Sequence, residues 1–94
     1  MEEEEEEEET LGTWIRYEGK DMWRQGEVAS LLISNFEDLD AIKAYIVEQG
    51  WNAFTEAEGW REVYVKSFDY TPTEANMGNC PAQGCNFWVY DPSI

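Results

Sequence analysis

Apolar residues recur at helical spacing in one segment of the chain. Leu39, Ile42 and Ile46 lie three or four positions apart, so a helix would carry them on one side. Gly50 then stands where many helices end in a residue of left-handed conformation. The pattern predicts a helix over residues 36–49 with an acidic outer face.

The start of this helix has two candidate caps. Ser34 and Glu37 have the spacing of a capping box, in which each side chain bonds the backbone N–H of the other residue. Asn35 and Asp38 have the same spacing and form the alternative cap. We expect the Ser34 and Glu37 pair to be used.

Five other segments are rich in β-branched and aromatic residues and are separated by turn residues, which is typical of strands. They cover residues 11–18, 27–33, 51–55, 60–68 and 86–90. The first is followed by a turn, so we expect a hairpin with the second. The near-continuous apolar end of the second predicts a central strand that is buried on both faces. The third and fourth flank Glu58-Gly59 and predict another hairpin.

The predicted order is strand, strand, helix, strand, strand, loop, strand, with the loop over residues 71–85. It predicts the α+β class, as a small, mostly antiparallel sheet of four to five strands with one helix packed on one face. We expect residues 11–94 to form this single domain. Residues 1–10 are expected to be a disordered polyglutamate tail or a solubility tag, because a block of like charges has nothing to bury.

Charge narrows the classes of partner. The formal net charge is -15, from 21 acidic and 6 basic residues, and it is still -7 without the eight consecutive glutamates. Direct binding to nucleic acid or to anionic membranes is disfavoured, because both need positive charge at the contact. No apolar stretch approaches a membrane span, and the acidic N-terminus is unlike a signal peptide. We therefore expect a cytoplasmic protein whose partner is a basic protein, such as one that itself binds nucleic acid.

Two cysteines and no histidine limit the chemistry. Pro81 and Gly84 can bend the chain enough to bring Cys80 and Cys85 together. We expect two reduced thiols first, a local disulfide second and a metal site last, because zinc would need two further ligands. Without histidine there is no Ser-His-Asp or Cys-His system, and no phosphate-binding loop motif is present. We expect no enzyme, no metal and no cofactor.

The acidic composition favours a non-enzymatic inhibitor or binding module that imitates nucleic acid. Carboxylates at phosphate-like spacing can bind Lys and Arg side chains laid out for DNA or RNA. The composition is similar in character to phage- and plasmid-borne inhibitors of the anti-defence or antirestriction type, although no motif residues are shared. The helix surface is the first candidate contact and the second hairpin is the next. The residues predicted to bind the partner are Glu37, Asp38, Asp40 and Glu48, then Glu56, Glu58, Trp60 and Glu62.

Two other functions stay open. The tryptophans and tyrosines, together with the loop over residues 71–85, would suit a small-ligand or glycan-binding module. A toxin-neutralising or assembly-regulating protein would present the same acidic surface to an enzyme active site. Core filling and interface anchoring are the more usual roles of such aromatic residues.

Overall fold

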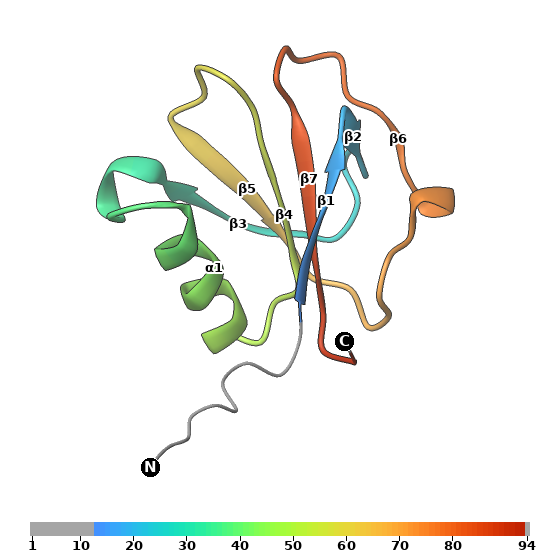
Figure 1. Cartoon of the computed structure of the whole chain (residues 1–94), viewed down its shortest axis with the longest axis horizontal. Coiled ribbons are helices and arrows are strands. Elements are labelled where there is room, and N and C mark those ends of the chain that lie inside the picture. The colour runs from blue at the N-terminus through green and yellow to red at the C-terminus, as the bar shows by residue number, and fades with distance from the viewer. Residues whose placement is uncertain (1–12, 94) are drawn as a thin grey trace.

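The chain has the predicted α+β architecture in the computed structural model, which describes residues 13–93; the predicted tail at residues 1–10 lies outside them (Figure 1). The larger sheet contains β1 (Thr13–Glu18), β3 (Glu27–Leu32), β4 (Ala53–Glu56), β5 (Glu62–Lys66) and β7 (Asn86–Asp91). Its spatial order is β1-β7-β4-β5-β3, and all neighbouring strands are antiparallel. The remaining elements are β2 (Lys20–Asp21), β6 (Gly78–Asn79), α1 (Leu39–Glu48) and the 3-10 turns η2 (Ile33–Asn35) and η3 (Glu74–Asn76). Among the described residues, no helix is long and apolar enough to cross a membrane.

The helix covers one face of the larger sheet. Ile42 and Ile46 of α1 pack against Phe54, Val63 and Val65, and all five side chains are buried. In β5 the two valines alternate with an exposed tyrosine, as expected for a strand with one face toward a core. The helical spacing of the isoleucines and the alternation of the valines therefore build this core together.

The opposite face of the sheet is covered by irregular chain. In Figure 1 the small β2–β6 ribbon lies across the molecule from α1. Side chains from the sheet and from the segments around this ribbon form a second core: Met22, Ala53, Phe87 and Val89, with Tyr17, Phe68 and Met77 packed against them. The sheet thus has two different covers, a helix on one face and two loops on the other.

The C-terminus of α1 is the predicted one. Gly50 has φ +85°, its N–H donates to Val47 at 3.0 Å, and the N–H of Trp51 donates to Ile46 at 3.0 Å. These bonds form a Schellman motif, which satisfies carbonyls that the last helical turn leaves open.

The predicted N-terminus of α1 is wrong. The helix starts at Leu39 instead of Phe36, and its cap is Asp38, whose carboxylate accepts from the Ala41 N–H at 2.9 Å. Neither the Ser34–Glu37 pair nor the Asn35–Asp38 pair forms a capping box there. The N–H of Ile33 donates to Arg61 at 2.8 Å and continues the β3–β5 pairing, so residues 33–35 turn as η2 before a helix can begin.

The prediction for the second strand is also wrong, because β3 is an edge strand. Ala29 and Leu31 pack toward the helix-side core, but Val28 and Leu32 are 48% and 46% exposed. The apolar run resembles that of a doubly buried strand, yet the irregular cover on the far face does not reach it. A register shift between Glu27 and Ala29 interrupts the β3–β5 ladder near its start.

The first two long strands do not form the predicted hairpin. β1 pairs with β7, so that Trp14 faces Tyr90 across the ladder, while β3 pairs with β5 at the other edge of the sheet. The chain leaves β1 through Gly19, forms β2, and crosses the sheet before β3 begins. The other local predictions are confirmed, since β4 and β5 form a hairpin and β7 is the last strand.

The segment over residues 71–85 is more ordered than a loop prediction implies. It contains η3, with a capping box between Thr73 and Asn76, and β6, which pairs with β2. Cys80 and Cys85 form a disulfide with Cα atoms 6.2 Å apart, so the expectation of two reduced thiols is wrong. Both residues bond the backbone of Gly19, at 2.9 Å and 2.7 Å, and this shared partner brings them together.

Replacing Gly50 with Ala tests the helix terminus. We expect Gly50→Ala to lower the free energy of unfolding by about 1 kcal/mol, because a side chain disfavours the left-handed conformation. No heavy atom lies within 4 Å of the added Cβ, so the loss measures backbone strain alone. Gly78→Ala is the control in urea unfolding, since that site is equally open and has no positive φ. Equal effects of the two changes would contradict the assignment.

Candidate functional site

The four acidic residues predicted on the helix are exposed but unevenly spread. Glu37 and Asp38 precede the first turn of α1, Asp40 lies within it, and Glu48 is the last helical residue. A rise of about 1.5 Å per residue separates Asp40 from Glu48 by about 12 Å along the axis. Three of the four thus gather at the helix N-terminus, where carboxylates also stabilise the helix itself.

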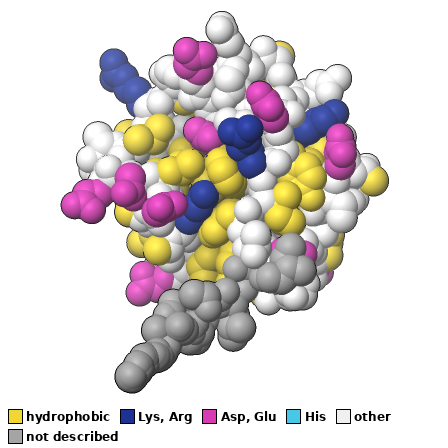
Figure 2. All heavy atoms as spheres, in the orientation of Figure 1, with side chains coloured by type: hydrophobic (Ala, Val, Ile, Leu, Met, Phe, Trp, Pro, Cys, Tyr) yellow, Lys and Arg dark blue, Asp and Glu magenta, His cyan; other side chains and the backbone are white. Residues whose placement is uncertain are grey.

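A basic side chain interrupts this acidic surface. The Lys43 Nζ atom lies 3.8 Å from the ring centroid of Trp88, and Trp88 Nε1 donates to Glu56 Oε2 at 2.8 Å. In Figure 2 acidic side chains gather on the side of the molecule where α1 lies, with a basic side chain beside them. The surface over the helix therefore has mixed charge.

The second predicted patch does not form one surface. Alternation along β4 and β5 places Glu56 on the helix side and Glu62 on the opposite side. Glu56 is half-buried and accepts hydrogen bonds from Trp88 and from Asn86, the latter at 3.2 Å. Glu58 is exposed in the β4–β5 turn, and its side chain lies against the 81–85 loop. These three carboxylates have separate environments.

Trp60, the aromatic member of that predicted patch, lines a cavity instead. The cavity has a volume of about 280 Å³ and lies where the turn after β2, the start of β3 and the β4–β5 hairpin meet. It is on the sheet face opposite α1, because Thr55 and Tyr64 alternate with the helix-side residues of their strands. Its lining residues are Asp21, Trp23, Arg24, Glu27, Thr55, Trp60 and Tyr64.

A buried carboxylate forms the floor of this cavity. Asp21 is only 4% exposed, and its Oδ1 atom accepts from the Thr55 hydroxyl at 2.7 Å and from the Met22 N–H at 2.8 Å. Within residues 13–93 no donor bonds the Oδ2 atom and no Lys or Arg forms an ion pair with this carboxylate. Buried charges are normally paired, so this floor has unused capacity for a ligand.

Aromatic rings form the walls. The Trp60 and Tyr64 rings meet at 5.3 Å between centroids with an interplanar angle of 81°, an edge-to-face arrangement. Trp23 is 61% exposed, in a turn closed by the Gln25 N–H donating to Met22 at 3.1 Å. A large apolar ring exposed beside a hollow is a common feature of binding sites.

Two residues of the 22–26 loop beside the cavity have positive φ. Arg24 has φ +61° and is the non-glycine residue with positive φ among residues 13–93. Gly26 has φ +67°, and a Cβ there would lie 2.6 Å from the Phe68 ring. Strained backbone costs about 1 to 3 kcal/mol and persists where the surrounding structure fixes it, often at binding sites.

The disulfide loop is hydrogen-bonded to the chain just before the residue that forms the cavity floor. Gly19 is bonded to Cys80 and Cys85, β2 follows at once, and Asp21 is the last residue of β2. Cys85 is itself buried. The 71–85 segment, which belonged to the alternative ligand-binding hypothesis, does not line this cavity and contacts the chain just before it, at Gly19.

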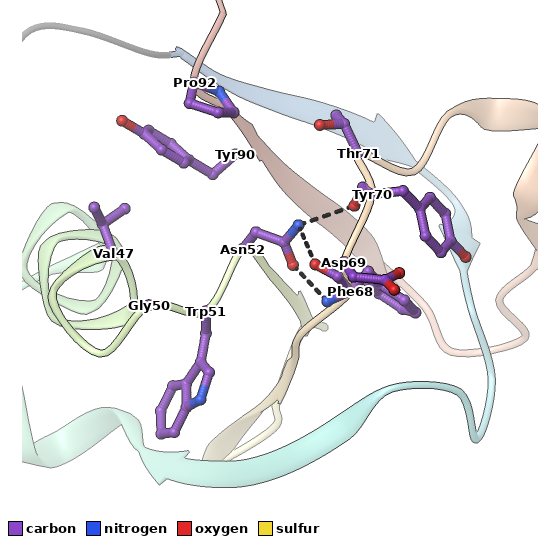
Figure 3. Close-up of a pocket in the computed structure, with 10 residues that line it drawn as sticks. All are labelled: Val47, Gly50, Trp51, Asn52, Phe68, Asp69, Tyr70, Thr71, Tyr90 and Pro92. Atoms are coloured by element: carbon purple, nitrogen blue, oxygen red, sulfur yellow. Dashed lines mark hydrogen bonds between the residues drawn. The ribbon is translucent and has the colours of Figure 1, made fainter.

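A second hollow, of about 360 Å³, has a structural explanation. Figure 3 shows Asn52 at its centre, bonded to the backbone of the 68–70 segment. Its side chain accepts from the Phe68 N–H at 2.9 Å and donates to the carbonyls of Phe68 and Tyr70 at 3.2 Å and 3.1 Å. Because the Asn52 amide already makes hydrogen bonds to the backbone, it has little capacity left to bind a ligand, unlike the Asp21 carboxylate.

A shifted carboxyl pKa occurs at Asp91, outside the Asp21 cavity. Near the second hollow, the hydroxyl and then the N–H of Ser93 donate to Asp91 and hold the pKa of that carboxyl below its ordinary value. Within the described part of the chain, no cluster of three or more metal-ligating side chains occurs.

Comparison with protein families, curated proteins and solved structures gives no match. The Asp21 cavity is therefore interpreted from its own geometry.

Of the residues that line this cavity, Trp60 alone was predicted from the sequence to bind a partner. Asp21 looks like an ordinary turn residue after Gly19, and its bond to Thr55 joins residues 34 positions apart. The one available signal was Trp23, a tryptophan in the polar stretch Trp-Arg-Gln-Gly. A bulky aromatic residue in a turn has little core to enter, which points to exposure.

Removing the Thr55 hydroxyl tests the floor of the cavity. We expect Thr55→Val to lower the free energy of unfolding by about 1 to 3 kcal/mol, because the shape is kept while a buried carboxylate loses a donor. Thr71→Val is the control, since Thr71 is exposed. Urea unfolding compares them, and a loss no larger than that of the control would show that the bond does not stabilise the fold.

Proposed function

We propose that this protein is a non-enzymatic binding domain, and that the cavity over Asp21 binds a small polar ligand or one group of a larger one. The observation that carries this proposal is a nearly buried carboxylate with an unused oxygen, at the floor of an aromatic-walled hollow. This combination of apolar walls and a few fixed polar groups is typical of ligand sites.

The size of the hollow limits what fits. Pockets for drug-sized ligands span roughly 300 to 1,000 Å³. At about 280 Å³ the Asp21 cavity suits a single small group. Asp21 would orient it through the carboxylate oxygen that has no donor among the described residues, and Trp23, Trp60 and Tyr64 would supply apolar contact.

A role in binding is favoured over catalysis. The chain has no histidine, the residue that most often serves in general acid–base catalysis. The Thr55 hydroxyl is also committed as a donor to Asp21.

Truncating Trp23 tests this function. We expect Trp23→Ala to weaken the binding of any ligand of the cavity by about tenfold, with little effect on stability, because the ring is mostly exposed. Tyr70→Ala is the matched control, an exposed ring outside the cavity. Two-dimensional amide spectra and tryptophan fluorescence would be recorded with choline, glycine betaine, methyl glucoside and N-acetylglucosamine. If none of the four perturbs the cavity residues, the proposal fails.

Imitation of nucleic acid by the acidic surface is a second candidate function. It is supported by the exposure of Glu37, Asp38, Asp40 and Glu48 and by the net charge of -7 outside the consecutive glutamates. Acidic side chains can be complementary to a basic groove on a partner protein. The interruption by Lys43 and the use of Asp38 as a cap weaken this candidate relative to the cavity.

Charge reversal tests the second candidate. We expect Asp40→Lys with Glu48→Lys to weaken binding of a basic partner, identified by capture from host lysate at two salt concentrations, by tenfold or more as an order of magnitude. Stability should change little, because lysine is unfavourable near the first turn of the helix and favourable in the last. Glu74→Lys, an exposed acid on η3, is the control. Equal affinity of the double variant and the control variant would exclude this helix surface.

A further inference from the structure

The aromatic walls of the Asp21 cavity are not coplanar. Trp60 and Tyr64 both line the hollow, and their ring planes are inclined at 81° in an edge-to-face arrangement, so the two rings present differently oriented aromatic surfaces. Trp23 adds a third ring from a separate turn. A flat sugar ring stacks best on one flat aromatic face, whereas a compact, rounded group can contact several faces at once.

The charge inside this cavity is negative. Two carboxylates, Asp21 and Glu27, and one guanidinium, that of Arg24, line it. Arg24 is exposed, and among residues 13–93 it forms neither a salt bridge nor a cation–π contact. The only charge held deep in the hollow is therefore that of Asp21.

The buried lysine on the same side of the sheet does not neutralise Asp21 by direct contact. Lys66 is 3% exposed, and its Nζ atom donates to the Gln25 carbonyl at 3.3 Å. No carboxylate of the described residues lies within 4.0 Å of that nitrogen. Asp21 thus has no cationic partner among the described residues, and a carboxyl group in an aromatic-lined cavity is an environment that favours a cation.

We infer that the cavity lined by Asp21, Trp23, Trp60 and Tyr64 binds an alkylated ammonium group, an inference that rests on the binding function proposed above. Such a group is compact and cationic. Its methyl groups contact the aromatic faces, and the electron-rich faces attract its charge. The Asp21 carboxylate supplies the counter-charge and needs no direct N–H donor from the ligand. The group can belong to a free small molecule or to a methylated lysine of a peptide.

A matched pair of probes separates charge from shape. Choline and its neutral carbon analogue 3,3-dimethylbutan-1-ol have nearly the same form, and both would be titrated into the full chain while amide and indole N–H signals are recorded. We expect choline to bind about tenfold more tightly, with shifts at Trp23 and Trp60. If the neutral alcohol binds equally well, or if only a sugar binds, the inference is overturned while the binding function stands. If no probe binds the cavity, both fail.

Two variants test the assigned residues. Asp21→Asn keeps the oxygen that accepts from Thr55 and Met22 but removes the charge, so choline should bind about tenfold more weakly and the alcohol unchanged. Asp69→Asn, an exposed site at the other hollow, is the control. If Asp21→Asn does not fold, Trp23→Leu gives the same discrimination, because it keeps apolar contact at an exposed site and removes the aromatic face. An equal loss for both probes would overturn the inference.

A third comparison identifies the source of the group. A peptide with trimethyllysine and free choline would be titrated in parallel, with the unmethylated peptide as the control. Tighter binding of the methylated peptide than of choline supports the inference and assigns the group to a protein. Tighter binding of choline supports it and assigns the group to a small molecule. Equal binding of the methylated and unmethylated peptides, with no binding of choline, contradicts it.

Discussion

Covering the second face of the sheet is the constraint on which this structure depends. The five strands carry apolar side chains on both faces, but the described chain has one α-helix, and that helix packs against Phe54, Val63 and Val65 on one side. The other side is covered by segments with few apolar residues. Met22 and Phe68 of these segments pack in the second core. The β2–β6 pairing, the disulfide and the Asn52 hydrogen bonds fix the other parts of the covering segments. Polar groups are therefore buried on this side, and the Asp21 cavity forms where that cover is incomplete.

The two faces of the sheet also differ in the burial and pairing of their charged side chains. On the helix side, Lys43, Trp88 and Glu56 form a chain of contacts in which the charged ends remain partly exposed, so each stays solvated. On the other side, Asp21 and Lys66 are both nearly buried without pairing directly. A charge that is removed from water and left without a direct counter-ion has a high free energy. This contrast favours the irregular side for the proposed binding site.

Local patterns predicted the elements well and the pairing poorly. The isoleucine spacing in α1, Gly50 at its end and the β4–β5 hairpin follow from residues close in sequence, and all three are confirmed. The edge position of β3 depends on which face the distant cover reaches, and no local signal reports that. The same holds for the disulfide, whose cysteines both bond Gly19, and for the Asp21–Thr55 contact. Of the predicted site, Trp60 alone lies in the cavity, while the acidic residues are spread over separate surfaces.

The position of β7 has a consequence for folding. This strand is the last of the described strands, yet it lies between β1 and β4, and in the described sheet β1 pairs with no other strand. During folding, β3, α1, β4 and β5 can assemble from segments that are close in sequence, but in the described sheet β1 has no partner until residues 86–91 pair with it. Pairing of such distant segments is slow, because loop closure opposes it before contacts compensate. Until then Trp14 and its neighbours lack the strand that pairs with β1, so a partly folded chain without β7 exposes apolar surface and is prone to aggregate.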